Sequence, residues 1–313
     1  MVRGANMKRK TAELNLLKHS SDGIFDFAVN LLLILILIIT VYPLYFIVIA
    51  SLSDPDAVNT GSMLLYPIGG KDRLLNFEGY IRVFMDNRIW RGYYNTIIYT
   101  FFGTLLGVTA TILAGYSLSR KDLVGKGPIT GIFVFTMYFG GGLIPTYMVV
   151  DKLHLINTPL VMIILGSISV YNIIIAKSFF QNTMSVELQE AAFIDGCGNG
   201  IFFLKIVVPL SKSIISVLTL YYAVGHWNSF FSALIYLNNE KLYPLQLILR
   251  DILIASQMLV SDTTDIESIG DAQRIAESLK YAVIIVSTLP VLIMYPFLQR
   301  YFIKGVMIGS VKG

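Results

Sequence analysis

The stretch ELQEAAFIDGCGNGIFFLKIVVP, residues 187–209, is a polar segment between two long apolar runs. Free backbone groups in such a segment need water or protein partners, so it is expected outside the hydrocarbon of a membrane. Ser185 is a suitable N-cap, Glu187 and Glu190 favour the positive start of a helix, and Gly196 can adopt the left-handed turn that ends it. The stretch therefore predicts a short surface helix followed by a glycine turn.

Composition indicates the setting of this stretch. The chain has 313 residues, of which 55% are hydrophobic and 14% charged, and its mean hydropathy is +0.68. These values indicate an all-α polytopic membrane protein rather than a soluble domain. Apolar windows of roughly 20 residues, enough to cross the bilayer, predict six transmembrane helices at about 27–50, 94–118, 129–150, 158–177, 211–237 and 281–302. Within the third window, Gly140-Gly141-Gly142 and Pro145 predict an interruption of the helix. The predicted organisation is an N-terminal arm, 1–26, and a six-span domain, 27–313, with a polar loop at 185–209.

The distribution of charge predicts the orientation. The side that carries both termini and the polar loop has 14 basic and 7 acidic residues, and the opposite side has 10 basic and 13 acidic residues. Basic residues accumulate on the cytoplasmic side of membrane proteins. Both termini and the loop are therefore expected in the cytoplasm, and the basic N-terminal arm is interpreted as a topology signal, not as a nucleic-acid site.

The loop also matches a known pattern. Glu190-Ala191-Ala192, three residues, Gly196, nine residues, Ile206 and then Pro209 resembles the cytoplasmic EAA loop of ABC-importer permeases. Val208 stands where that family usually has Leu, which keeps an apolar contact. Pro209 suits the first turn of the next helix. The residues that this resemblance assigns to ATPase coupling are Glu190, Ala191, Ala192, Asp195, Gly196, Ile206 and Pro209.

Further motifs extend the resemblance over nearly the whole chain. They are Ala50-Ser51-Leu52-Ser53, Asn95-Thr96, Pro145-Thr146-Tyr147, Leu155-Ile156-Asn157-Thr158, Trp227-Asn228, Tyr243-Pro244-Leu245-Gln246 and the ending QRYFIKGVMIGSVKG. Together they are similar to carbohydrate-uptake ABC permeases, especially the oligo- and polysaccharide branch related to the smaller permease of the maltose importer. Thr96 departs from the Ser common in relatives. The resemblance implies the six-helix type I ABC importer fold.

The same resemblance implies partners and a mechanism. Such permeases work with a second related permease, two cytoplasmic ATPase subunits that hold ATP and Mg, and an extracellular solute-binding protein, in the plasma membrane of a prokaryote. Transport of an oligosaccharide or polysaccharide fragment would proceed by alternating access. The chain itself is expected to be a non-catalytic subunit without a cofactor, because it lacks the phosphate-binding motif G-x-x-x-x-G-K-[ST].

Two sets of polar residues are candidates for contact with ligands. Polar and aromatic groups at membrane depth are functional candidates, although bonds between helices explain each of them equally well. These substrate-path candidates are Tyr171, Asn172, Trp227 and Asn228. The segment 238–258 mixes polar and apolar residues as a docking surface does, or else packs as a lid. Its candidates for contact with the binding protein are Tyr243, Gln246 and Arg250.

Two other functions compete with sugar import. An ion-coupled carrier is disfavoured because no predicted span contains the Asp or Glu that such carriers commonly use. An ABC permease for a non-sugar solute such as a peptide stays open, since the EAA loop is shared among many solutes. His19, His154 and His226 lie far apart along the topology, so no metal site is expected.

Overall fold

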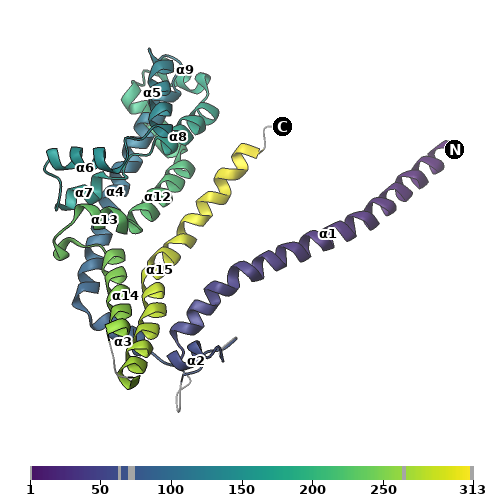
Figure 1. Ribbon diagram of the computed structural model, residues 1–313. Coiled ribbons are helices and arrows are strands. Elements are labelled where there is room, and N and C mark those ends of the chain that lie inside the picture. Colours follow the sequence, from purple (N-terminus) through teal and green to yellow (C-terminus); the bar gives the residue numbers. More distant parts are fainter. Residues whose placement is uncertain (1, 63–64, 70–74, 263–265, 311–313) are drawn as a thin grey trace. The chain divides into compact units, whose positions relative to one another are not determined.

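The computed structural model describes residues 2–62, 65–69, 75–262 and 266–310, and over parts of the first and the last two helices it describes the backbone alone. All regular elements in these ranges are helices, as Figure 1 shows. The chain divides into two units, Met1–Glu78 and Gly79–Gly313, which are described separately below.

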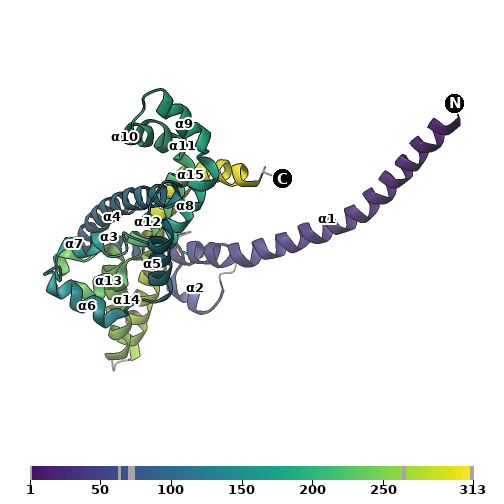
Figure 2. The ribbon, with the colours of Figure 1, turned by 90° about the horizontal axis from the view of Figure 1, so that it is seen from above.

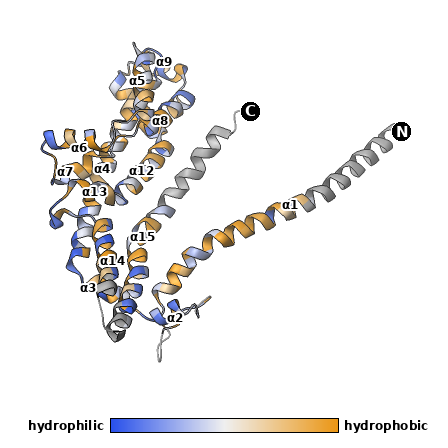
Figure 3. Cartoon of the chain, viewed as in Figure 1, coloured by the Kyte–Doolittle hydropathy of each residue, from blue (hydrophilic) through white to orange (hydrophobic). Residues whose placement is uncertain are grey.

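The first unit consists of α1 (Val2–Ser51) and the short α2 (Pro55–Asn59). The part of α1 from Phe25 to Ser51 is long and apolar enough to cross a membrane, and Figure 3 shows hydrophobic colour along it. Ser53 closes the end of this span: its Oγ donates to the Ile49 carbonyl at 2.6 Å and accepts from the Ile68 amide at 3.1 Å. The motif Ala50–Ser53 is thus a helix terminus fastened to the segment that follows.

The second unit contains the remaining elements. In chain order they are α3 (Glu78–Met85), α4 (Asn87–Ser119), α5 (Lys126–Tyr138), α6 (Leu143–Lys152), α7 (Pro159–Ile164), α8 (Val170–Thr183), α9 (Val186–Ile194), α10 (Asn199–Phe202), the π-helical η1 (Phe203–Val207), α11 (Val208–Leu210), α12 (Lys212–Trp227), α13 (Phe230–Tyr236), the 3-10 helix η2 (Glu240–Leu242), α14 (Leu245–Asp262) and α15 (Ile266–Ser310). Figure 2 gives a second view of their arrangement.

Helix α4 is the central helix of this unit, and it packs against α7, α8, α12 and α14. Its glycines allow close approach: a Cβ on Gly107 would lie 2.6 Å from the Ser167 carbonyl oxygen, and one on Gly115 would lie 2.6 Å from the Ala176 Cβ. Small residues let apolar helices in a membrane bring their backbones together. The glycines therefore determine which helices α4 can contact.

The predicted spans are only partly continuous helices. Among the described residues, three helices are long and apolar enough to span a membrane, and the bent pairs α5–α6 and α10–α12 raise the number to five if each pair is one span. The predicted interruption of the third span is confirmed, because α5 ends at Tyr138, α6 begins at Leu143 and the pair is bent by 113°. The expected fourth span is divided into α7 and α8 by a turn at Gly166 with φ of +82°.

Side chains from neighbouring helices satisfy the polar groups at the α7–α8 break. The Tyr222 hydroxyl accepts a hydrogen bond from the Ser169 amide at 3.2 Å and lies 2.6 Å from the hydroxyl of Thr111. Ser167 is buried, and its hydroxyl lies within hydrogen-bonding distance of the Gly103 carbonyl, at 3.2 Å, and of His226 Nε2, at 3.3 Å. Non-helical backbone at membrane depth persists only where protein or water satisfies it, and α4 and α12 do so here.

The segment after α13 differs from the long loop expected there. It forms α14, and α15 begins at Ile266, before the predicted start of the sixth span. Polar side chains of α4 hold the start of α14: Asn95 Nδ2 donates to the carbonyls of Lys241, at 2.9 Å, and Tyr243, at 3.0 Å, and Thr96 Oγ1 accepts from the Leu245 amide at 2.8 Å. The motifs Asn95-Thr96 and Tyr243-Pro244-Leu245-Gln246, which are distant in sequence, are thus joined by hydrogen bonds.

The glycine contacts of α4 give the first prediction. Gly107→Ala should lower the free energy of unfolding by about 1–3 kcal/mol, because the new methyl group meets a backbone oxygen that cannot move independently. The matched control is Gly131→Ala on α5, where nothing lies within 4 Å of the added carbon. Thermal unfolding in detergent measures both variants, and equal melting temperatures would contradict the close approach of α4 to residue 167.

Candidate functional site

The polar loop 185–209 lies at one end of the second unit, with α9 labelled there in Figure 1. Its predicted helix and caps are confirmed. Ser185 Oγ accepts a hydrogen bond from the Leu188 amide at 3.3 Å, and Gly196 has a φ of +80° directly after the helix. Nothing lies within 4 Å of a Cβ added at Gly196, so backbone conformation alone favours glycine at this position.

The two faces of α9 differ. Ala192 is buried in a cluster with Phe180, Phe202 and Val207, so this alanine anchors the helix to its own chain. Glu187, Glu190, Ala191 and Asp195 are exposed, and Ile194 is 86% exposed. The outward face of α9 therefore combines carboxylates with an exposed isoleucine. The coupling residues predicted from sequence are therefore divided between an inner and an outer face.

The end of the loop connects it to the fifth span. Ile206 belongs to η1, a short π-helical stretch, and is half-buried against the cluster around Phe202. Pro209 is exposed and lies in the first turn of the short α11, not of the long α12 that the sequence prediction implied. The helices from α10 to α12 bend by 77° at Ser211, whose buried hydroxyl donates to the Val207 carbonyl at 2.6 Å. Loop and span thus meet at a hydrogen-bonded corner.

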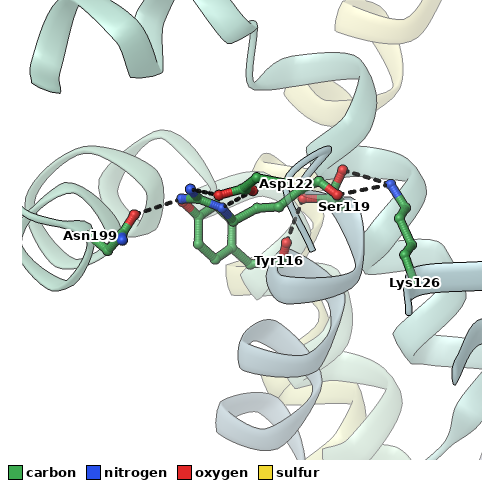
Figure 4. Close-up of polar contacts among 6 residues, drawn as sticks. Tyr116, Ser119, Asp122, Lys126 and Asn199 are labelled. Atoms are coloured by element: carbon green, nitrogen blue, oxygen red, sulfur yellow. Dashed lines mark hydrogen bonds and ion pairs between the residues drawn. The ribbon is translucent and has the colours of Figure 1, made fainter. Parts of the chain in front are cut away.

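Arg120 joins this loop to α4. It follows the last residue of α4, and its Nε and Nη2 donate to the two Asp122 carboxylate oxygens at 2.7 and 2.5 Å. Its Nη1 donates to Tyr116 Oη at 3.1 Å and to Asn199 Oδ1 at 2.9 Å. Figure 4 shows Tyr116 and Asp122 together on one side, with Asn199 facing them from its own helix.

Charge and aromatic contacts reinforce the position of Arg120. The guanidinium carbon lies 5.9 Å from the ring centroid of Tyr116 and 6.0 Å from that of Phe193 on α9. The hydrogen bonds from Arg120 hold the pKa of Asp122 below its ordinary value, so the carboxylate stays charged at neutral and mildly acidic pH. Lys126 Nζ donates to the backbone carbonyls of Ser119 and Arg120 at the end of α4 (Figure 4).

A cavity of about 610 Å³ lies between this arginine network and α9. Its lining includes Tyr116, Arg120, Gln181, Glu187, Glu190 and Phe202. Hydrogen bonds from the Glu187 backbone amide and the Ser185 hydroxyl lower the pKa of the exposed Glu187 carboxyl. Among the described residues no group of three His, Cys, Asp or Glu side chains lies close enough together to hold a metal ion.

The four substrate-path candidates do not share one environment. Tyr171 is 60% exposed, whereas Asn172 is buried on α8. Asn228 is exposed, and its Nδ2 donates to the Val224 carbonyl of its own helix at 3.0 Å. Trp227 is buried and lines an apolar groove of about 570 Å³ between α4, α12 and α15. Thr100 and Thr104, whose buried hydroxyls have no hydrogen-bond partner in the described structure, line the same groove.

Trp227 also has a structural role at a proline in α15. Pro290 has no amide hydrogen, so the carbonyl of Val286, four residues earlier, lacks its helical partner. The Tyr93 hydroxyl donates to this carbonyl at 2.7 Å, and Trp227 Nε1 donates to the next carbonyl, that of Ser287, at 2.9 Å. Two aromatic residues from α4 and α12 thus stabilise the proline turn of α15.

The docking candidates lie around the start of α14. Tyr243 and Gln246 are half-buried, and the backbone carbonyl of Tyr243 accepts from Asn95. Arg250 lies 3.5 Å from Asp251, and both side chains are about two-fifths exposed. The three candidates are thus all partly accessible, and the backbone of Tyr243 also contributes to the fold.

The proline turn gives the second prediction. Tyr93→Phe should destabilise the protein by about 0.5–1.5 kcal/mol, because the Val286 carbonyl loses its donor. In a Pro290→Ala background the same change should have a smaller effect, because residue 290 then supplies the helical N–H. A double-mutant cycle on thermal unfolding in detergent measures the difference, and equal effects in both backgrounds would contradict this role of Tyr93.

Comparisons with known proteins agree with this architecture. No protein-family model matches the chain. The polygalacturonan/rhamnogalacturonan transport system permease protein YtcP of Bacillus subtilis (strain 168) is 38% identical over 293 residues, which are 93% of this chain and 99% of that protein. Protein LplC of the same organism is 36% identical over 96% of this chain and 100% of that protein.

A solved structure and a further relative also point to carbohydrate transporters. A crystal structure of a bacterial ABC transporter involved in the import of the acidic polysaccharide alginate contains a chain that matches with a TM-score of 0.75 and 29% identity, over 90% of this chain and 98% of that chain. The arabinooligosaccharides transport system permease protein AraQ of Halalkalibacterium halodurans is 25% identical over 95% of this chain. Given its helical fold, apolar spans and EAA-type loop, the chain belongs to the carbohydrate ABC transporter permeases.

Proposed function

We propose that this protein is a permease subunit of an importer for acidic oligosaccharides derived from plant or microbial polysaccharides. The observation that carries the proposal is the loop 185–209, a capped helix and left-handed glycine turn that present Glu190 and Ile194 outward while Ala192 fixes the helix to the bundle. This arrangement suits transmission of force from a cytoplasmic ATPase. The subunit itself needs no nucleotide, since it has no phosphate-binding motif.

The mechanism follows from the connections of this loop. ATP binding closes two partner ATPase subunits, and they displace α9 through its exposed carboxylates and Ile194. Because Ala192 and Phe202 are packed in one cluster with residues of α4, α8 and α12, a displacement of α9 shifts these helices together. With a second permease, such a movement exposes a central path alternately to the two sides of the membrane.

Two similar proteins support an acidic substrate. The name of one relative describes polygalacturonan and rhamnogalacturonan, and the transporter of known structure is involved in the import of alginate, an acidic polysaccharide. The predicted spans of this chain contain neither Asp nor Glu, so they would not repel the carboxylates of a uronic acid. A neutral oligosaccharide is the second candidate, favoured by the name of the arabinooligosaccharide relative at 25% identity.

The location follows from the same function. An importer that receives sugar from an extracellular binding protein requires the ATPase side, and hence the loop 185–209, in the cytoplasm. The excess of basic residues on the loop side supports the orientation with both termini inside. Arg250 and its neighbours at the start of α14 would then lie on the outer face, where the binding protein docks, and Trp227, Tyr171, Asn172 and Asn228 would lie in or beside the path.

The third prediction concerns the substrate. Proteoliposomes that contain the complete importer and its binding protein should accumulate labelled oligogalacturonate when ATP is supplied. Reduced oligogalacturonate, in which the carboxylates have become neutral alcohols, is the matched control of equal length and should accumulate at least tenfold less, since a specific site for charged groups is left unpaired. Preferential uptake of the neutral sugar would contradict an acidic substrate but not an importer.

The fourth prediction concerns coupling. Glu190→Ala should leave folding intact, because this carboxylate is exposed, and should remove a charged hydrogen bond to the ATPase worth about 1.5–3 kcal/mol. Sugar-stimulated ATP hydrolysis and uptake should therefore fall together. Gly196→Val should be more severe, because a β-branched residue resists a φ of +80°. Lys212→Ala, an exposed change near the loop, is the control. Normal uptake in both loop variants would contradict a coupling role for the loop.

A further inference from the structure

We propose that Arg120 is a positioning residue that makes the loop 185–209, called the coupling loop below, move together with the central helix α4. The proposal deepens the function proposed above and rests on it. Arg120 is the residue immediately after α4, so its backbone moves with that helix, while its guanidinium reaches the loop at Asn199 on α10 and Phe193 on α9. One side chain thus connects the last turn of the central helix to both short helices of the loop.

The geometry around Arg120 gives it a single defined position. Asp122 binds Nε and Nη2 in a bidentate pair, and Tyr116 accepts from Nη1. Three of the four polar contacts of the guanidinium are therefore made to the end of α4 and the residues directly after it. The fourth, Nη1 to Asn199 Oδ1 at 2.9 Å, crosses to the loop. The Arg120 side chain is only 13% exposed, whereas that of Asp122 is 63% exposed. A planar guanidinium held by three hydrogen bonds has little freedom to move, whereas a lysine ammonium on its flexible chain would keep more freedom.

The apolar cluster beneath Arg120 does not by itself specify this connection. Phe180, Ala192 and Phe202 join the loop to the bundle through contacts that have no preferred direction. A hydrogen bond to Asn199 fixes both distance and direction between α10 and the end of α4. The cluster therefore holds the loop against the bundle, and Arg120 makes the loop move together with α4.

The hydrogen bond between Arg120 and Asn199 can be removed without changing the arginine. Asn199→Ala deletes only the acceptor, at an exposed position, whereas Asn199→Asp keeps an acceptor and adds a negative charge at the start of α10. Arg120→Lys keeps the charge but cannot reach Asp122, Tyr116 and Asn199 together. The matched control is Asn182→Ala, the same change at an exposed asparagine near the end of α8.

The test uses the complete importer in proteoliposomes with labelled oligogalacturonate as the probe, and it measures sugar imported per ATP hydrolysed. Asn199→Ala and Arg120→Lys should lower this ratio by about 5- to 20-fold, within the range typical of coupling between two sites. ATP hydrolysis should persist in both. Asn199→Asp and Asn182→Ala should retain the ratio of the unmodified complex. If Asn199→Ala and Asn199→Asp both keep that ratio, the proposal is wrong.

A second measurement does not depend on the sugar. In the complete complex with Cys197→Ser, spin labels at the exposed Ile201→Cys on α10 and Val124→Cys after α4 report the distance between the two segments with and without ATP. One narrow distance that is the same in both states is expected, and Asn199→Ala should broaden it. An unchanged narrow distance in Asn199→Ala would overturn the proposal. Absence of any sugar import by the unmodified complex would overturn the proposed function instead, while the distance measurement still tests Arg120.

Discussion

The structure depends on one constraint, which is that interrupted backbone inside an apolar helical bundle must find hydrogen bonds from neighbouring side chains. The break between α7 and α8 is satisfied by Tyr222 of α12, and the carbonyl freed by Pro290 in α15 is satisfied by Tyr93 of α4. The start of α14 is satisfied by Asn95 and Thr96 of α4. Each irregular segment therefore requires a specific helix beside it, because an unpaired polar group in hydrocarbon costs several kcal/mol.

This constraint explains why α4 is central. It carries the glycines that admit close neighbours and the polar side chains that satisfy the irregular segments of those neighbours. It also ends at the arginine network beside the loop 185–209. A helix that holds one end of α14 and also contacts the loop at its other end is well suited to connect events on the two sides of a membrane.

The same contacts change the interpretation of several polar residues. Trp227 is a candidate for ligand contact in the sequence, yet its indole N–H is bonded to the backbone carbonyl of Ser287. Thr100 and Thr104 line a groove with hydroxyls that have no partner in the described structure, although a threonine in an apolar helix gives no such signal in sequence. In this bundle, polar residues within the spans bond to irregular backbone nearby, so polarity within a span does not by itself mark a ligand site.

The sequence by itself determined the features that depend on local chemistry. The apolar windows predicted a helical membrane protein, Ser185 and Gly196 predicted the ends of α9, and the glycines before Pro145 predicted an interrupted third span, because caps, positive φ and helix breaks act within a few residues. Only the tertiary structure decided the division of the fourth span, the inward position of Ala192 and the contacts of Arg120 with the loop. These features arise from contacts between distant residues, such as Arg120 with Asn199 and Ser169 with Tyr222, and no local pattern contains the partner that makes each arrangement stable.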